Sequence, residues 1–115
     1  MAIAHAASGQ LIDIKPLASQ LLQAQSHALC KTGDLEVMRL VIPAHKFVPP
    51  HHVDGDLTLQ CLEGEIELTT DGRTRPMAAG QMLWLAGGVE YSITALKNAS
   101  LLVTIALYRR AASRV

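Results

Sequence analysis

The chain has 115 residues, and its ten basic and ten acidic side chains cancel to a formal net charge of +0. This balance argues against nucleic acid or an anionic membrane as a partner, because binding to either normally needs an excess of basic side chains. Half of the residues are hydrophobic but only 3% are aromatic, so a core must be aliphatic. The apolar runs are too short to span a bilayer and the first residues lack the pattern of a secretory signal, so we expect a cytoplasmic protein.

The composition indicates one domain with extensions at both ends. Residues 1–25 predict an N-terminal extension and cap, in which Leu17, Leu21 and Leu22 at helical spacing favour a short helix. Residues 26–110 contain the strand-like segments and predict the domain itself. Residues 111–115 are expected to be a C-terminal tail.

Short strands and turns alternate from Ser26 onward. The segments SHALCK and LEVMRLVI flank a Gly-containing turn at Gly33 and predict a first hairpin. In the second segment neither parity is uniformly polar, which indicates that both faces of the strand are covered. Pro49 and Pro50 suit a strand end or an edge strand, because proline cannot donate to a ladder.

The middle and end of the chain continue this pattern. In LTLQCLE, one face carries Leu57, Leu59 and Cys61, which we expect to point inward. Asp71-Gly72 between EIELTT and RTRPM predicts a hairpin, and further segments follow, QMLWLA, VEYSITAL and SLLVTIALY. Many short strands at this spacing are typical of an all-β sandwich or barrel.

Residues 49–65 and 80–91 resemble the two motifs of the cupin superfamily, and the glycine spacing carries the resemblance. Within this superfamily, the chain resembles the RmlC-like, small single-domain cupins of type 2. The resemblance implies an all-β, antiparallel jelly-roll β-barrel with a short N-terminal cap. Counted from Gly64, His51 falls on the first metal-binding histidine of the family.

The other metal-binding positions of the family hold different residues. Val53 stands at the second histidine, Leu57 at the glutamate and Tyr91 at the histidine of the second motif. A catalytic metal usually needs about three protein ligands. The metal-binding motifs are therefore degenerate. The candidate metal ligands are His51 and His52, and His45, Cys61 or Tyr91 would be the further ligands.

Successive residues of a strand point to opposite faces, so His51 and His52 cannot both address one ion without a bulge. The motif register selects His51 for the interior and leaves His52 at the rim. His51 is also a candidate catalytic acid or base, and Tyr91 a candidate hydrogen-bond donor or catalytic group. The predicted ligand-binding residues are His51, Leu57, Leu59, Cys61 and Tyr91.

Three further expectations concern packing. Cys30 and Cys61 are expected to be reduced thiols rather than a disulfide. Trp84 and Met82 could line a binding pocket, but we expect them in the core or at a subunit interface. Apolar residues on the opposite strand faces, including Leu62 and Leu102, predict a homodimer.

Three functional hypotheses remain open. The first is a noncatalytic barrel that binds a small molecule or serves regulation. The second is a metal-dependent enzyme, similar to cupin dioxygenases or isomerases, in which His51 and atypical ligands hold zinc, iron, nickel or manganese. The third is a metal-free epimerase or isomerase that uses histidine acid/base chemistry. We favour the first, with a small-molecule ligand and no cofactor.

Overall fold

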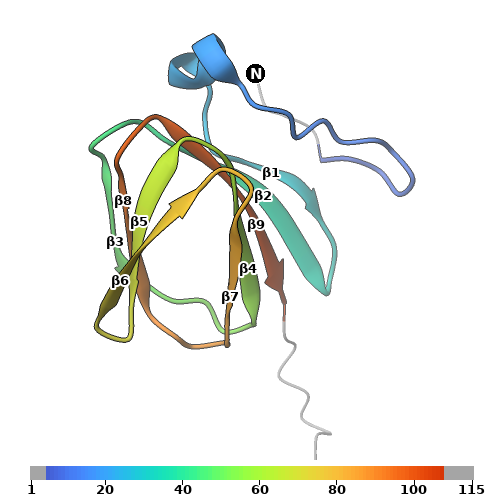
Figure 1. Cartoon of the computed structure of the whole chain (residues 1–115). Coiled ribbons are helices and arrows are strands. Elements are labelled where there is room, and N and C mark those ends of the chain that lie inside the picture. The colour runs from blue at the N-terminus through green and yellow to red at the C-terminus, as the bar shows by residue number, and fades with distance from the viewer. Residues whose placement is uncertain (1–4, 108–115) are drawn as a thin grey trace, which may run out of the picture.

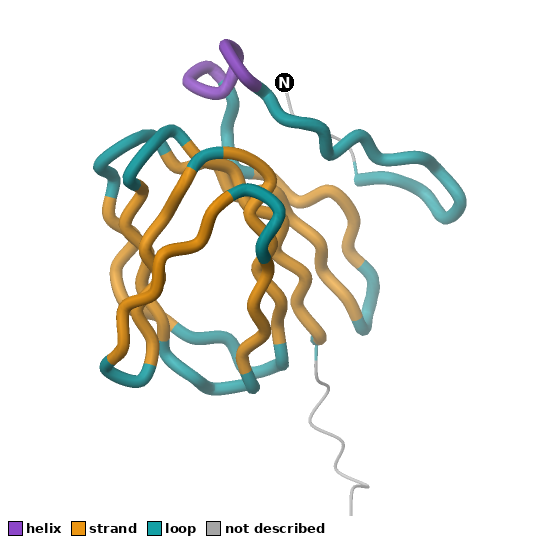
Figure 2. The backbone as a smooth tube through the Cα atoms, viewed as in Figure 1, coloured by secondary structure: helices purple, strands orange, loops and turns teal. Residues whose placement is uncertain are grey.

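The computed structural model describes residues 5–107, which form two antiparallel sheets facing each other across a common core (Figures 1 and 2). The five-stranded sheet has the order β1-β2-β9-β4-β7 and the four-stranded sheet the order β3-β8-β5-β6. This architecture confirms the predicted all-β jelly-roll barrel. The strands are β1 His27–Lys31, β2 Leu35–Ile42, β3 Phe47–His51, β4 Leu57–Glu63, β5 Glu65–Thr70, β6 Arg73–Ala78, β7 Met82–Leu85, β8 Tyr91–Ala95 and β9 Ala99–Ala106.

The turns lie where the sequence predicts them. The hairpin between β1 and β2 closes around Gly33, and that between β5 and β6 around Asp71 and Gly72. These last two residues have φ angles of 52° and 73°, the left-handed conformation that tight hairpin turns require. β3, which contains Pro49 and Pro50, is an edge strand of its sheet, as expected.

The core lies between the sheets and is almost entirely aliphatic. Leu57, Leu59 and Cys61 of β4 all point into it, as the alternation predicts, with exposed fractions of 3%, 0% and 0%. Cys30 lies on β1, which two strands separate from β4 in the sheet, and both cysteines are free. The expectation of reduced thiols therefore agrees with the structure.

The N-terminal cap contains one short 3-10 helix, Ala18–Gln23, in which Leu21 is buried and Leu22 is exposed. The residues before it form an extended arm, residues 5–17, that projects away from the barrel (Figure 1). The predicted tail, residues 111–115, lies outside the described residues. No helix among the described residues is long and apolar enough to cross a membrane.

A polar cluster on the outer side of the five-stranded sheet fastens the arm. The Arg39 guanidinium, only 4% exposed, lies 3.1 Å from the Glu63 carboxylate and donates to the Lys15 carbonyl oxygen. The Ser100 hydroxyl donates to Glu63 over 2.6 Å. Both faces of β2 are thus covered around Arg39, as its mixed alternation indicates.

The expectation of a core position for Trp84 and Met82 is wrong. Their side chains are 64% and 59% exposed, because Leu83 and Leu85 occupy the inward positions of β7. Trp84 pairs with Thr58 and Met82 with Gln60, on the outer face of the five-stranded sheet. The alternative, a subunit interface, remains a prediction.

Candidate functional site

His51 and Tyr91 form the contact that the motif resemblance singles out. They are register partners, His51 at the end of β3 and Tyr91 at the start of β8, so both side chains lie on the same face. Their rings are 4.4 Å apart at the centroids and tilted by 51°. The structure thus brings together two residues that are far apart in the sequence.

Both ring nitrogens of His51 have hydrogen-bond partners. Nδ1 lies 3.0 Å from the Pro49 carbonyl oxygen, which can only accept, so this nitrogen carries the proton in the neutral ring. Nε2 lies 3.0 Å from the Tyr91 hydroxyl and then accepts from it. The lone pair that a metal would need is therefore engaged by a phenol.

The two partners differ in exposure. His51 lies on the same inward face as Tyr91, but it is exposed because β3 is an edge strand and its end lies at the rim. Tyr91 is only 5% exposed, and burial raises the pKa of its phenol. Tyr91 consequently remains a protonated hydrogen-bond donor at neutral pH.

The remaining predicted ligand-binding residues are part of the packed core. Leu57 and Leu59 belong to the main hydrophobic cluster between the sheets. The Cys61 thiol donates to the Glu63 carbonyl oxygen over 3.3 Å, and burial raises its pKa, so it stays protonated. A contact between these three residues and a ligand stays a prediction.

The residues present do not fit the metal that the cupin fold implies. His52 is exposed and Leu57 is buried in the core. Within residues 5–107, no group of three or more histidine, cysteine, aspartate or glutamate side chains is placed to hold a metal ion. His51, with both nitrogens engaged, would be a lone ligand, so we derive no chemistry through a metal.

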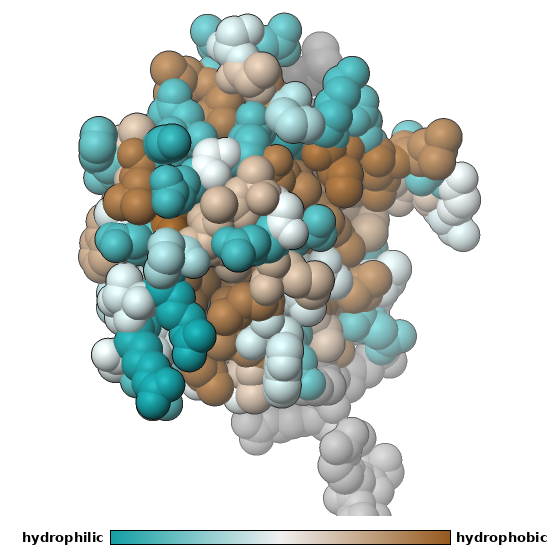
Figure 3. Space-filling view, in the orientation of Figure 1, coloured by the Kyte–Doolittle hydropathy of each residue, from teal (hydrophilic) through white to brown (hydrophobic). Residues whose placement is uncertain are grey.

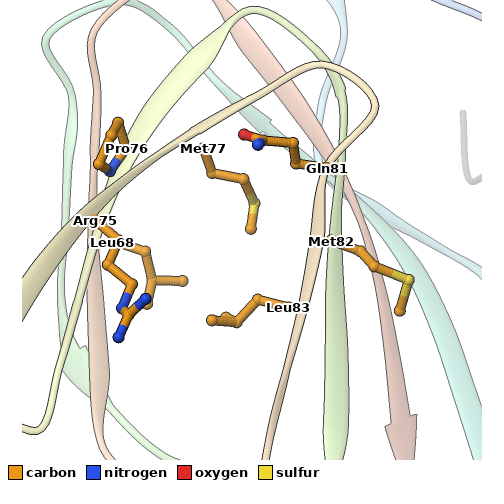
Figure 4. A pocket seen from close by; sticks show the side chains of 7 residues that line it. All are labelled: Leu68, Arg75, Pro76, Met77, Gln81, Met82 and Leu83. Atoms are coloured by element: carbon orange, nitrogen blue, oxygen red, sulfur yellow. The ribbon is translucent and has the colours of Figure 1, made fainter.

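A cavity opens between the edge strands β6 and β7, where the two sheets come together (Figure 4). Its volume is about 180 Å³. Met77 from β6 and Leu83 from β7 point into the gap, and Leu68 of β5 lies behind it (Figure 4). The complete lining is Leu68, Arg75, Pro76, Met77, Gln81, Met82 and Leu83.

In the sequence, the pocket-lining alternative for Met82 points to this cavity, and one further signal was available. In RTRPM, Arg75 has the same parity as Met77, and the hairpin register pairs Arg75 with the buried Leu68. A residue paired with a core leucine points to the same side of the sheet as that leucine. The pattern therefore places an arginine beside the core. It does not predict that a gap separates β6 from β7.

Solved structures with this fold are numerous, whereas sequence comparison finds nothing. No family model matches the chain, and no curated protein matches it significantly. A conserved protein of unknown function from Streptococcus pyogenes superposes with a TM-score of 0.71 at 20% identity, over 95% of this chain and 99% of that one.

Two further similar structures are described as cupins. One from Desulfitobacterium hafniense has a TM-score of 0.72 at 16% identity, over 85% of this chain and 95% of its own. An RmlC-like cupin from Desulfovibrio desulfuricans has a TM-score of 0.67 at 23% identity, over 90% and 98%. The chain therefore has the cupin, RmlC-like jelly-roll fold, which by itself assigns no activity.

Proposed function

We propose that this protein is a noncatalytic, small-molecule-binding barrel whose ligand occupies the cavity between β6 and β7. The observation that carries the proposal is that residues of the main core line this cavity. Its lining includes Leu68 and Met77, which are 1% and 5% exposed and belong to the main core cluster. A group that enters between the two strands therefore reaches apolar side chains at once.

The volume restricts the ligand to a small group. The cavity of about 180 Å³ is close in size to the dry cavity of about 150 Å³ that accepts benzene in another protein. Its apolar lining gains free energy when a ring-sized group replaces poorly bound water. The part of the ligand that enters the cavity is thus one ring or a short branched chain.

Methionine-methyl NMR tests this proposal directly. The protein labelled at its methionine methyl groups is titrated with toluene, and the Met77 signal is expected to shift in a saturable way. Met38, which packs against the core without lining the cavity, is the internal control. Leu83→Phe, which fills the cavity, is expected to abolish the shift. An unmoved Met77 signal at saturating toluene refutes the proposal.

A metal-dependent enzyme is the first alternative, with His51 and atypical ligands holding zinc, iron, nickel or manganese. It is less supported because the described residues bring no ligand set together. Elemental analysis of protein purified without chelator, in wild type and His51→Ala, decides the matter. Near-stoichiometric metal that disappears in the variant would establish the alternative over the binding function.

A metal-free epimerase or isomerase is the second alternative. The His51–Tyr91 pair supports it, because a histidine and a phenol in contact can donate and accept protons at the rim. No carboxylate hydrogen-bonds to His51 among the described residues. Turnover that is lost in both His51→Ala and Tyr91→Phe, without bound metal, would establish it.

We also propose a homodimer formed through the outer face of the five-stranded sheet, in a cytoplasmic protein. Apart from the Arg39–Glu63 pair beneath the arm, the outward residues of β2, β9, β4 and β7 carry no charge. This uncharged part of the face, called the uncharged face below, comprises Val37, Thr58, Gln60, Met82, Trp84, Leu102 and Thr104. The outer face of the other sheet carries Glu65 and Glu67 instead. A solvent-facing sheet normally carries charged side chains, so the absence of charge on this part of the face supports its burial.

The N-terminal arm supports a second copy as the partner. It carries Leu11, which is 96% exposed, and Ile12, which is 37% exposed, on a segment that projects from the barrel (Figure 3). A twofold pair can bury both the arm and the uncharged face on each chain. Size-exclusion chromatography with light scattering is expected to give twice the chain mass, and a monomer would refute the dimer.

A further inference from the structure

The hairpin of β5 and β6 sorts its charges between the two faces of its sheet. Glu65 and Glu67 pair with Ala78 and Pro76 on the outer face. On the inner face, the register instead pairs Leu68 with Arg75 and Thr70 with Arg73. The acidic side chains of the hairpin strands thus point outward, and the arginines lie on the side of the barrel interior.

The rest of the inner face has the same character. β8 adds Tyr91, Ile93 and Ala95 as partners of the inward residues of β5. β3 adds Val48 and His51 as partners of Ile93 and Tyr91. Among the described strand residues, the inner face of the four-stranded sheet therefore contains hydrogen-bond donors and cations but no carboxylate.

Arg75 is the charged residue of this face that lines the cavity. Figure 4 shows its guanidinium beside Leu68, at the side of the gap opposite Leu83. Among the described residues it forms no hydrogen bond or ion pair, whereas Arg39 is fully engaged by Glu63 and Ser100. Gln81 adds a side-chain amide whose oxygen already accepts from the Ala78 N–H, which leaves its NH₂ group as a donor.

We propose, building on the binding function above, that the cavity between β6 and β7 binds a small organic carboxylate, with its apolar group against Leu68, Met77 and Leu83 and its carboxylate on Arg75. The planar guanidinium matches a carboxylate with two parallel hydrogen bonds. A cationic ligand would meet Arg75 without any neighbouring carboxylate. A neutral ligand would leave the cation unused.

Benzoate and benzamide are matched probes for this inference, because they share a ring and a planar head group but differ in charge. Titrations follow the Met77 methyl signal in the full-length protein. Benzoate is expected to bind wild type about tenfold more tightly than benzamide. Hydrogen bonds to charged groups are more favourable in free energy than those between neutral groups, by roughly the difference that a tenfold change in affinity represents. In Arg75→Gln the two affinities are expected to become equal.

Arg73→Gln is the control, because it removes the same charge from the same strand and face but lies outside the cavity lining. It is expected to keep most of the preference for benzoate. Equal affinities of both probes for wild type, or an unchanged preference in Arg75→Gln, would refute the carboxylate while leaving the binding function intact. If neither probe nor toluene binds wild type, both the carboxylate inference and the binding function are refuted.

Discussion

Glu63 is the residue on which the attachment of the N-terminal arm depends. Its carboxylate accepts the backbone N–H groups of Leu17 and Ala18, the Ser100 hydroxyl and the Arg39 guanidinium. The side chain of Glu63 is 12% exposed. One buried carboxylate thus joins β4, β2, β9 and the arm.

Removing this charge is expected to destabilise the protein strongly. In Glu63→Gln the Arg39 guanidinium remains buried without a counter-charge, which costs about 3 kcal/mol of the free energy of unfolding. Urea denaturation measures the loss. Glu67→Gln, on the outer face of the four-stranded sheet, is the control and is expected to change stability by less than about 0.5 kcal/mol. Equal midpoints for the two variants would contradict the role of Glu63.

The same carboxylate predicts how stability depends on pH. Burial by itself would raise the pKa of Glu63, but its backbone and hydroxyl donors and the Arg39 charge together lower the pKa below its ordinary value of 4.5. Since the folded-state pKa is the lower one, the stabilisation is complete above pH 4.5 and is lost as the pH falls through the folded-state pKa. Denaturation curves at several acidic pH values are expected to show a decline in wild type that is reduced in Glu63→Gln.

At the scale of elements, the turns define where strands pair. Two glycines show two different reasons why a turn needs glycine. Gly72 needs its φ of 73°, but an added Cβ would meet nothing within 4 Å. Gly55 lies in the turn before β4, where an added Cβ would come within 1.7 Å of the Ala106 carbonyl oxygen. The first glycine serves conformation and the second serves a close approach of two backbones.

These glycines predict substitutions of unequal cost. Gly72→Ala is expected to lower the free energy of unfolding by about 1 kcal/mol, the cost of a left-handed alanine. Gly55→Ala is expected to cost several times more, because the backbone of β9 must move away from β4. Chemical denaturation of both variants measures the difference. A larger effect of Gly72→Ala would contradict this explanation.

At the scale of the whole molecule, the two outer faces of the barrel are expected to differ in what covers them. Trp84→Lys places a charge on the uncharged face and is expected to convert the dimer to a monomer without a large loss of stability. Phe47→Lys is the matched control, because Phe47 is 53% exposed on the edge of the other sheet. Light scattering reads out the mass. A dimer that persists in Trp84→Lys would place the interface elsewhere.

The sequence by itself determined the strands, their turns and the residues of the core. Local chemistry suffices for these features, because side chains alternate along a strand and Gly, Asp and Pro restrict the backbone. The inward set Leu57, Leu59 and Cys61 and the edge position of Pro49-Pro50 are examples. The motif spacing also identified the His51 and Tyr91 positions, which the structure places in contact.

Only the tertiary structure decided which residues separated in sequence meet and where the two sheets leave a gap. Arg39 and Glu63 pair because β2 and β4 both flank β9, and the cavity at Arg75 exists because β6 and β7 are edges of different sheets. Trp84 is exposed because β7 turns Leu83 and Leu85 inward instead. Such features depend on strand order and sheet packing, which no local pattern of residues contains.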